Sequence, residues 1–389
     1  MNDSLRLSWE RKKIILFGNL ETGVFERRSF LKGVCATLLT TLGPVRITQA
    51  SDNDVEALVA RTLIVGFEGN ETDDPEFKAL LSLIQQRPLG GVIYLARNIA
   101  GDANVLRMNA ALRSAAAEPL FISVDEEGGS VRRLRRLRSV PNTPSARHVA
   151  QMDPEESLEL YAEMAQAVAR LGFNLNYGPV LDLAVNKNSA VISRLGRSYG
   201  REPELVAAHA SSFIGAHHSF GVQTAIKHFP GHGSVSADPH DAPVDASSSW
   251  SPAELEPFRL VLAQERPLFL MTSHQVIAHP LLKASPGVPI TFSPEAVAFA
   301  RQRLGFQRLV ISDDLMMGAI AARHSPEEAV IKALLAGHDC VILAEIGRGA
   351  VPRIGQIITA VAQAAQRSPQ LMGRLEQANA RIRKAKAAL

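Results

Sequence analysis

The stretch PEEAVIKALLAGHDCVILAE, residues 326–345, joins a helix-like segment to a strand-like one. Its first part ends at Gly337, and glycine often closes a helix because it adopts the left-handed backbone conformation without strain. Its second part, CVILAE (340–345), is almost entirely apolar, as in a strand buried on both faces of a parallel sheet. The stretch therefore predicts one helix–strand unit of an α/β fold.

The same alternation repeats along the chain from residue 55 onward. Two more helix-like segments end on glycines, Gly172 and Gly221. Seven more runs resemble buried strands: RTLIVGF (61–67), GGVIYLA (90–96), PLFISVD (119–125), FNLNYGPVLDL (173–183), VQTAIKHF (222–229), PLFLMTS (267–273) and RLVISDD (308–314). Eight such units in about 300 residues predict an α/β fold of the (β/α)8 TIM-type barrel. A doubly wound open sheet is the alternative, but no G-x-G-x-x-G follows the first run.

The bulk composition fits one catalytic domain over residues 51–389, ending in a helical segment of about 40 residues that packs outside the barrel. The 389 residues are 46% hydrophobic and 21% charged, which is ordinary for a globular protein. The formal charge of +3 comes from the first 50 residues, which hold eight Lys/Arg and four Asp/Glu. The rest is close to neutral, so we expect no nucleic-acid partner. We expect a monomer.

Residues 1–50 are interpreted as an N-terminal extension that contains an export signal. Arg27 and Arg28 are followed by SFLK and a mildly apolar stretch of 13 residues (33–45). R-R-x-F-L-K is the pattern of a twin-arginine signal, and a membrane-spanning helix needs about 20 residues. We therefore expect the export machinery as a partner and a periplasmic location, or a cytoplasmic one if the segment does not act as a signal. Removal of Cys35 with it would leave Cys340 and no internal disulfide.

Polar side chains follow five of the predicted strands. In a TIM-type barrel the active site forms where the strands end, so these groups should meet at one rim. Burying charged groups is costly unless they are paired, solvated or used in chemistry, which makes the rim the expected functional site. The set comprises Asp125, Glu126, Glu127, Asp182, Lys227, His228, Ser273, His274, Asp313 and Asp314.

The fifth of these strands runs into KHFPGHGSVSADPH (227–240), which contains three of the chain's 11 histidines. His228 and His232 are four residues apart, as zinc ligands on a helix can be, but a proline and two glycines break any helix here. We therefore expect no metal and no cofactor. Glycoside hydrolysis instead needs one group to attack the sugar and one to protonate the leaving oxygen. Histidine suits the second task because its pKa lies near neutrality.

Five motifs in the chain together resemble the β-N-acetylglucosaminidases of glycoside hydrolase family 3. The motifs are VDEEGGSVRR, LGRSYG, KHFPGHG, an Asp-x-His pair and SDDLMM, and they occur in the family's order within residues 55–345. The family fold is a TIM-type barrel, in agreement with the eight predicted strands. The resemblance implies a retaining β-N-acetylhexosaminidase that forms a covalent glycosyl-Asp intermediate. Its expected partner is an oligosaccharide containing terminal β-linked N-acetylglucosamine, from cell-wall muropeptides or chitin.

The resemblance also implies roles for individual residues. Asp313 is the implied nucleophile, His240 the general acid/base and Asp238 its dyad partner. Asp314 is the alternative nucleophile, because strand alternation alone cannot separate neighbours. The implied sugar-binding residues are Asp125, Arg133, Arg197, Lys227 and His228.

Some details of the sequence depart from the family or have more than one interpretation. Pro239 stands where the family usually has Ser, and proline restricts the backbone of Asp238. His232 lies between two glycines and is interpreted as a loop-forming residue. The arginine-rich RRLRRLR (132–138) is interpreted as a solvated loop that contributes Arg133 alone to the site.

Three other functions remain possible on these residues. A histidine acid/base tolerates an anionic acceptor, so a β-N-acetylglucosaminide phosphorylase is one alternative. A β-glucosidase-type family 3 hydrolase is another, although such enzymes use a second domain for which this chain has no room. A non-catalytic muropeptide-binding protein is disfavoured by the presence of Asp313, Asp238 and His240.

Overall fold

The computed structural model describes residues 52–236, 243–347, 349–387 and 389 of the chain. Within these residues, eight parallel strands close into a barrel in the order β1-β10-β9-β8-β7-β6-β3-β2. The barrel strands are β1 (Leu63–Val65), β2 (Gly91–Tyr94), β3 (Phe121–Val124), β6 (Leu175–Asn176), β7 (Gln223–Phe229), β8 (Phe269–Thr272), β9 (Leu309–Asp314) and β10 (Cys340–Leu343). Each lies inside one of the predicted runs, so the prediction of a (β/α)8 barrel is confirmed.

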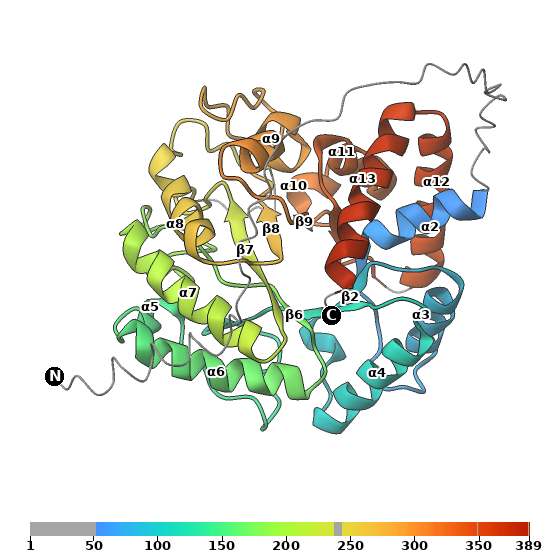
Figure 1. Ribbon diagram of the computed structural model, residues 1–389, viewed down its shortest axis with the longest axis horizontal. Coiled ribbons are helices and arrows are strands. Elements are labelled where there is room, and N and C mark those ends of the chain that lie inside the picture. The colour runs from blue at the N-terminus through green and yellow to red at the C-terminus, as the bar shows by residue number, and fades with distance from the viewer. Residues whose placement is uncertain (1–51, 237–242, 348, 388) are drawn as a thin grey trace, which may run out of the picture. The chain divides into compact units, whose positions relative to one another are not determined.

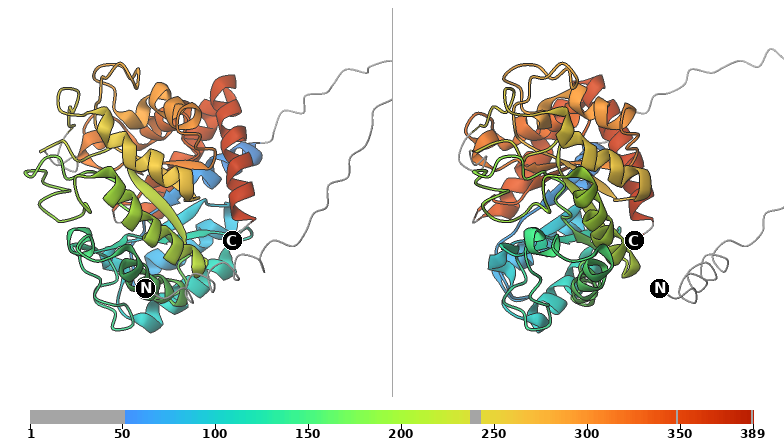
Figure 2. Two further views of the ribbon diagram at one scale, coloured as in Figure 1. Left: turned by 60° about the vertical axis from the view of Figure 1, so that its left-hand side comes forward. Right: turned by 90° about the vertical axis from the view of Figure 1, so that its left-hand side faces the viewer.

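Helices cover the outside of the barrel and alternate with the strands (Figure 1). The helices that follow successive strands are α3 (Pro75–Gln86), α4 (Asp102–Ala115), α6 (Pro154–Arg170), α7 (Pro203–Ser219), α8 (Glu256–Gln264), α9 (Pro294–Gln302), α11 (Pro326–Ala336) and α12 (Ala350–Gln366). Figure 2 shows this outer layer from two further directions. The predicted helix ends are confirmed, because Gly172, Gly221 and Gly337 all have positive φ angles, of 91°, 74° and 118°.

The chain ends in two helices rather than in one helical segment. Ser368 caps the second by accepting a hydrogen bond from the Leu371 N–H, and Pro369 occupies its first position. That helix, α13 (Pro369–Lys386), packs against α2 (Asp52–Thr62) and α12. Near its end Ile382 joins the core inside the barrel, and Lys386 Nζ lies 5.5 Å from the centre of the Phe121 ring. Phe121 begins β3, so α13 closes the N-terminal end of the barrel and leaves the opposite end for a site.

The predicted run 173–183 forms a much shorter strand than expected. β6 contains Leu175 and Asn176, after which an isolated bridge joins Val180 to Lys227. Pro179 lies between them and has no N–H to donate to a sheet ladder, so the chain leaves the regular pairing there. The following segment carries Asp182 beneath the end of β7, where it bonds to His228.

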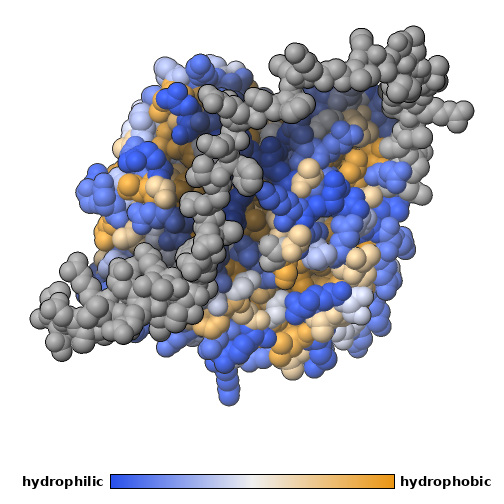
Figure 3. All heavy atoms as spheres, in the orientation of Figure 1, coloured by the Kyte–Doolittle hydropathy of each residue, from blue (hydrophilic) through white to orange (hydrophobic). Residues whose placement is uncertain are grey.

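Short elements lie in the loops at the C-terminal end of the barrel. A hairpin of β4 (Glu126–Gly128) and β5 (Val131–Arg132) follows β3, and the sequence did not predict it. The others are α5 (Ala146–Val149), α10 (Gly318–Ala321), η1 (Ala96–Asn98), η2 (Pro252–Leu255) and η3 (Ile290–Phe292). Figure 3 shows polar side chains over most of one face, interrupted by small apolar patches. No helix in the described part of the chain is both long and apolar enough to span a membrane.

Candidate active site

A pocket of about 390 Å³ opens at the C-terminal end of the barrel strands. Its polar lining residues are Asp125, Glu127, Arg133, Arg197, Lys227, His228, Asp313, Asp314 and Glu345. Every sugar-binding residue that the sequence analysis named lies among them, together with the expected nucleophile. The structure thus brings these residues into one cavity, as expected for strand-end residues of a TIM-type barrel.

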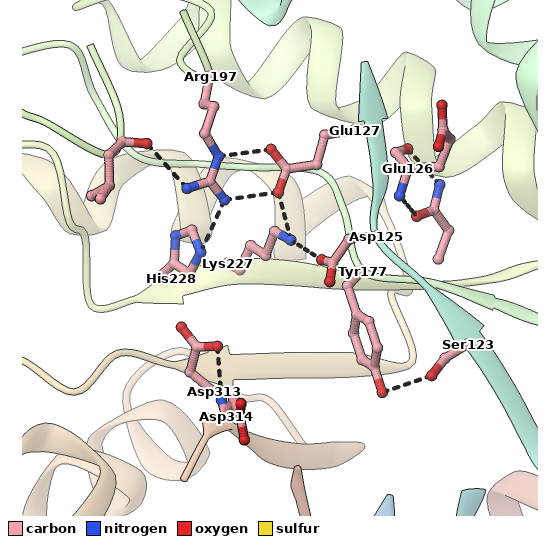
Figure 4. Close-up of polar contacts among 12 residues, drawn as sticks. Ser123, Asp125, Glu126, Glu127, Tyr177, Arg197, Lys227, His228, Asp313 and Asp314 are labelled. Carbon is pink, nitrogen blue, oxygen red and sulfur yellow. Dashed lines mark hydrogen bonds and ion pairs between the residues drawn. The ribbon is translucent and has the colours of Figure 1, made fainter. Parts of the chain in front are cut away.

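Glu127 organises the positive charges of the pocket (Figure 4). Its carboxylate accepts hydrogen bonds from Arg197 Nε and Nη2, each at 2.8 Å, and lies 2.6 Å from Lys227 Nζ. Lys227 Nζ also donates to Asp125 Oδ1 at 2.7 Å. Burial disfavours ionised Glu127, but the charges of Arg197 and Lys227 outweigh burial and hold its pKa well below the usual value. The cluster is therefore charged and preorganised, which suits binding of sugar hydroxyl groups.

His228 is fixed by a buried carboxylate that lies behind it. Its Nδ1 donates to Asp182 Oδ2 at 2.6 Å, because a carboxylate can only accept, and its backbone N–H donates to Asp182 Oδ1 at 3.1 Å. The Nε2 atom lies 3.4 Å from Arg197 Nη2 on the pocket side. Burial raises the pKa of Asp182, but its interactions with His228 and His232 outweigh burial and lower that pKa overall. Asp182 thus sets which ring nitrogen of His228 is presented to a ligand.

His232 has a structural position, as the sequence analysis interpreted it. Its backbone N–H donates to Asp182 at 2.8 Å, and burial lowers the pKa of its ring to about 4. The two flanking glycines are needed for close packing: a Cβ on Gly233 would lie 1.7 Å from the Leu183 carbonyl oxygen. Gly231 has a φ of +116° and packs against Glu254. The carboxylate of Glu254 accepts a hydrogen bond from the Gly233 N–H at 2.9 Å. The loop is thereby fixed as far as Gly233.

The expected acid/base His240, its partner Asp238 and Pro239 lie outside the described residues. Their roles remain predictions from the Asp-x-His motif. Among the residues that are described, no group of three or more His, Cys, Asp and Glu side chains is arranged to hold a metal ion.

The two carboxyl groups at the end of β9 have different surroundings. Asp314 Oδ1 accepts from the N–H groups of Met316 at 3.1 Å and Ala344 at 2.9 Å. Burial raises the pKa of Asp314 to about 7, and the negative charge of Asp313 adds to that rise. Burial also disfavours ionised Asp313, but its interactions with His274 and His228 outweigh burial and lower its pKa. The pair therefore offers one ionised carboxyl group and one that is about half protonated near neutrality.

The arginine-rich segment matches its interpretation except at one residue. Arg135, Arg136 and Arg138 are exposed, and Arg133 lines the pocket. Arg132, however, is buried rather than solvated: its Nε bonds to Glu126 Oε1 at 3.0 Å. This correction arises because the unpredicted β4–β5 hairpin pairs Glu126 with Arg132.

Several parts of the site were not assigned from the sequence. Glu127 and Asp182 were noted as strand-end acids, but their bridging roles depend on which strands become neighbours in the barrel. Glu254, which holds the loop at Gly233, lies in a separate 3-10 helix and carried no signal. The apolar part of the pocket lining includes Ile93, Tyr177, Met271, Met316, Met317 and Ile342.

Comparisons with known proteins agree with this geometry. Residues 67–385 match the family described as the glycosyl hydrolase family 3 N terminal domain. A beta-hexosaminidase from Xylella fastidiosa (strain M23) is 32% identical over 290 residues, which cover 72% of this chain and 82% of that protein. The solved structure of a beta-N-acetylhexosaminidase from Beutenbergia cavernae DSM 12333 has a TM-score of 0.76 and 27% identity, covering 86% of this chain and 98% of the other. A family 3 beta-N-acetylglucosaminidase from Paenibacillus sp. str. FPU-7 gives a TM-score of 0.75 and 30% identity, covering 86% and 62%.

Proposed function

Since this chain belongs to glycosyl hydrolase family 3 and is a glycoside hydrolase, we propose that it is a retaining β-N-acetylhexosaminidase. The proposed substrates are oligosaccharides with a terminal β-linked N-acetylglucosamine, from cell-wall muropeptides or chitin. The beta-hexosaminidase from X. fastidiosa and the beta-N-acetylhexosaminidase from B. cavernae support this choice of sugar.

The observation that carries the proposal is the position of Asp313. Its carboxylate has a lowered pKa and lines the same pocket as the Lys227–Glu127–Arg197 cluster. Figure 4 shows it turned toward His228 and Lys227 across the pocket. A sugar held by the cluster would thus have an ionised carboxylate beside it, which is what a glycosidase nucleophile requires.

The proposed reaction has two displacements. In the first, a carboxylate oxygen of Asp313 attacks the anomeric carbon, the glycosidic C–O bond breaks, and the leaving oxygen takes a proton from the acid, proposed to be His240. In the second, water attacks the same carbon and gives a proton to His240, and the ester bond to Asp313 breaks. Two inversions restore the original anomeric configuration.

The size and lining of the pocket support the removal of single terminal sugars. A volume of about 390 Å³ suits one sugar ring with its acetamido group better than a longer chain. Charged residues on one side can bind ring hydroxyls, and methionine side chains at Met271, Met316 and Met317 offer an apolar surface for an acetyl methyl group.

The proposal is tested by product analysis on matched substrates. We expect hydrolysis of 4-nitrophenyl β-N-acetylglucosaminide in large excess over the β-glucoside, with the β-anomer of N-acetylglucosamine formed first in the proton NMR spectrum. A preference for the glucoside would favour the β-glucosidase alternative. A sugar 1-phosphate as the main product in phosphate buffer would favour the phosphorylase.

We also propose export through the twin-arginine route. The support is the Arg27–Arg28 motif and the short apolar stretch after it. Cell fractionation of the full chain tests it: replacing both arginines with lysine should move the activity from the periplasm to the cytoplasm, and an unchanged distribution would contradict the proposal.

A further inference from the structure

A series of buried hydrogen bonds lies next to the end of β9. His338 Nδ1 donates to the Ala333 carbonyl at 3.0 Å, and its Nε2 lies 2.8 Å from Thr272 Oγ1. Burial lowers the pKa of His338 to about 3, so its ring is neutral and Nε2 can only accept. The single proton of the Thr272 hydroxyl is therefore donated to His338.

The next hydroxyl in the series, that of Thr291, also has its proton assigned by its partners. Thr291 Oγ1 lies 2.8 Å from the Ser273 carbonyl oxygen, which can only accept. Thr291 Oγ1 therefore has no proton to donate to His274 Nδ1, which lies 2.8 Å away, and must accept from it. His274 Nδ1 is consequently the donor in that bond.

The other nitrogen of His274 is a donor as well. Nε2 lies 2.9 Å from the Asp314 carbonyl oxygen, again an atom that can only accept. Both ring nitrogens of His274 thus carry protons, and the ring is an imidazolium although the residue is only 1% exposed. A buried positive charge is costly unless a negative charge lies close by.

We infer that His274 is held as a permanent imidazolium next to Asp313 and acts as a positioning residue for that carboxylate. The inference rests on the proposed function, in which Asp313 is the nucleophile. His274 contributes the largest favourable charge interaction on Asp313. Among the described residues, the other titratable or charged groups near the pair include Asp314 on β9, Lys227 and His228 on β7, and the neutral His338 after α11.

The position of His274 gives it two effects on the reaction. Its charge stabilises Asp313 as a carboxylate, both before attack on the sugar and when the ester breaks in the second displacement. Its hydrogen bond to the Asp314 carbonyl also fixes the backbone next to Asp313. A neutral replacement should therefore raise the pKa of Asp313 and slow the hydrolysis of the glycosyl-enzyme.

Nuclear magnetic resonance of nitrogen-15 histidine in the full chain tests the protonation state directly. The signals of His274 are identified by their loss in His274→Gln. We expect both ring nitrogens to have the shifts of protonated nitrogen and to stay so up to at least pH 8. A signal of a neutral tautomer at pH 7 would overturn the inference, whatever the enzyme hydrolyses.

Kinetics of the same variant test the effect on Asp313. A nearby opposite charge shifts a carboxyl pKa by about 1–3 units, so the acidic limb of the pH profile of kcat/KM in His274→Gln should move up by at least about one pH unit. Thr291→Val removes the acceptor for His274 Nδ1, so it should move the acidic limb in the same direction but by less. This variant replaces His274→Gln in the test if His274→Gln does not fold. If the acidic limb stays in place in a folded, active variant, this overturns the inference about His274 but leaves the proposed function intact. Absence of β-N-acetylhexosaminidase activity in the unaltered protein would instead overturn the proposed function.

Discussion

Asp313 and Asp314 are consecutive residues at the end of β9, yet their carboxyl groups have opposite pKa shifts. Asp314 uses Oδ1 to bind the backbone N–H groups of Met316 and Ala344, and burial raises its pKa to about 7. Burial also disfavours ionised Asp313, but the charges of His274 and His228 outweigh burial and lower its pKa. Their different surroundings separate two neighbours that the sequence pattern left as alternatives.

Replacement of each carboxyl group by an amide should therefore have very different effects. We expect Asp313→Asn to reduce kcat by at least about 10³-fold, because the nucleophile is lost. Asp314→Asn keeps an oxygen that can accept from Met316 and Ala344, so its loss in kcat should be far smaller. Steady-state kinetics on 4-nitrophenyl β-N-acetylglucosaminide compare the two, and a larger loss in Asp314→Asn would reverse the assignment.

The raised pKa of Asp314 also predicts a dependence of stability on pH. In the folded protein its pKa is about 7, against 3.8 for an ordinary aspartate. The folded state therefore binds the proton more tightly, so this contribution to stability is complete below about pH 4 and is lost as the pH rises through 7. Between these values it falls by at most about 1.4 kcal/mol per pH unit. Urea unfolding of the wild type at several pH values should show this loss, and Asp314→Asn should show a shallower dependence; parallel curves would contradict the assignment.

The barrel was predictable because its signals are local in the sequence. Apolar runs mark strands buried on both faces, and glycines such as Gly337 mark helix ends. Residues at strand ends, such as Lys227 and Asp313, could be placed in the site because parallel strands all end at the same rim. The barrel geometry alone brings them together.

The remaining features depend on contacts between segments that are distant in the sequence. Asp182 holds His228 from 46 residues away, and Glu127 joins Arg197 from 70 residues away. The double protonation of His274 follows from Thr291 and the Asp314 carbonyl, which no spacing rule connects to it. Such partners can be identified only when the strand order and the loop paths are known.

The bridging role of Glu127 predicts a large effect on stability. Glu127→Gln leaves the buried Arg197 and Lys227 with less negative charge, and breaking a buried pair costs about 3–5 kcal/mol of unfolding free energy. Glu118→Gln is the matched control, because the Arg61–Glu118 pair is 17% and 34% exposed and such pairs contribute about 0–1 kcal/mol. Chemical denaturation measures both, and equal losses in the two variants would show that Glu127 has no bridging role.

The close packing of Gly233 predicts a loss of activity from a single methyl group. A Cβ there would lie 1.7 Å from the Leu183 carbonyl oxygen, so the loop after β7 must move in Gly233→Ala. A displacement of about 1 Å near a reacting centre costs on the order of 10² in rate, and we expect a loss in kcat of that size. Gly355→Ala is the control: it lies inside α12 with no atom within 4 Å of the added Cβ, and should leave kcat unchanged while raising stability by about 0.5–1 kcal/mol. Normal turnover in Gly233→Ala would mean that the loop position does not matter for the reaction.

The central claim is that Asp313 attacks the sugar and forms a covalent intermediate. A 5-fluoro N-acetylglucosaminyl fluoride keeps the acetamido group and slows breakdown of the glycosyl-enzyme, so the adduct accumulates. Mass spectrometry of the digested protein should place one fluorosugar on the peptide that contains Asp313, and Asp313→Asn should remain unlabelled. Labelling of Asp314 or another residue, or steady turnover of the reagent without any adduct, would contradict the account.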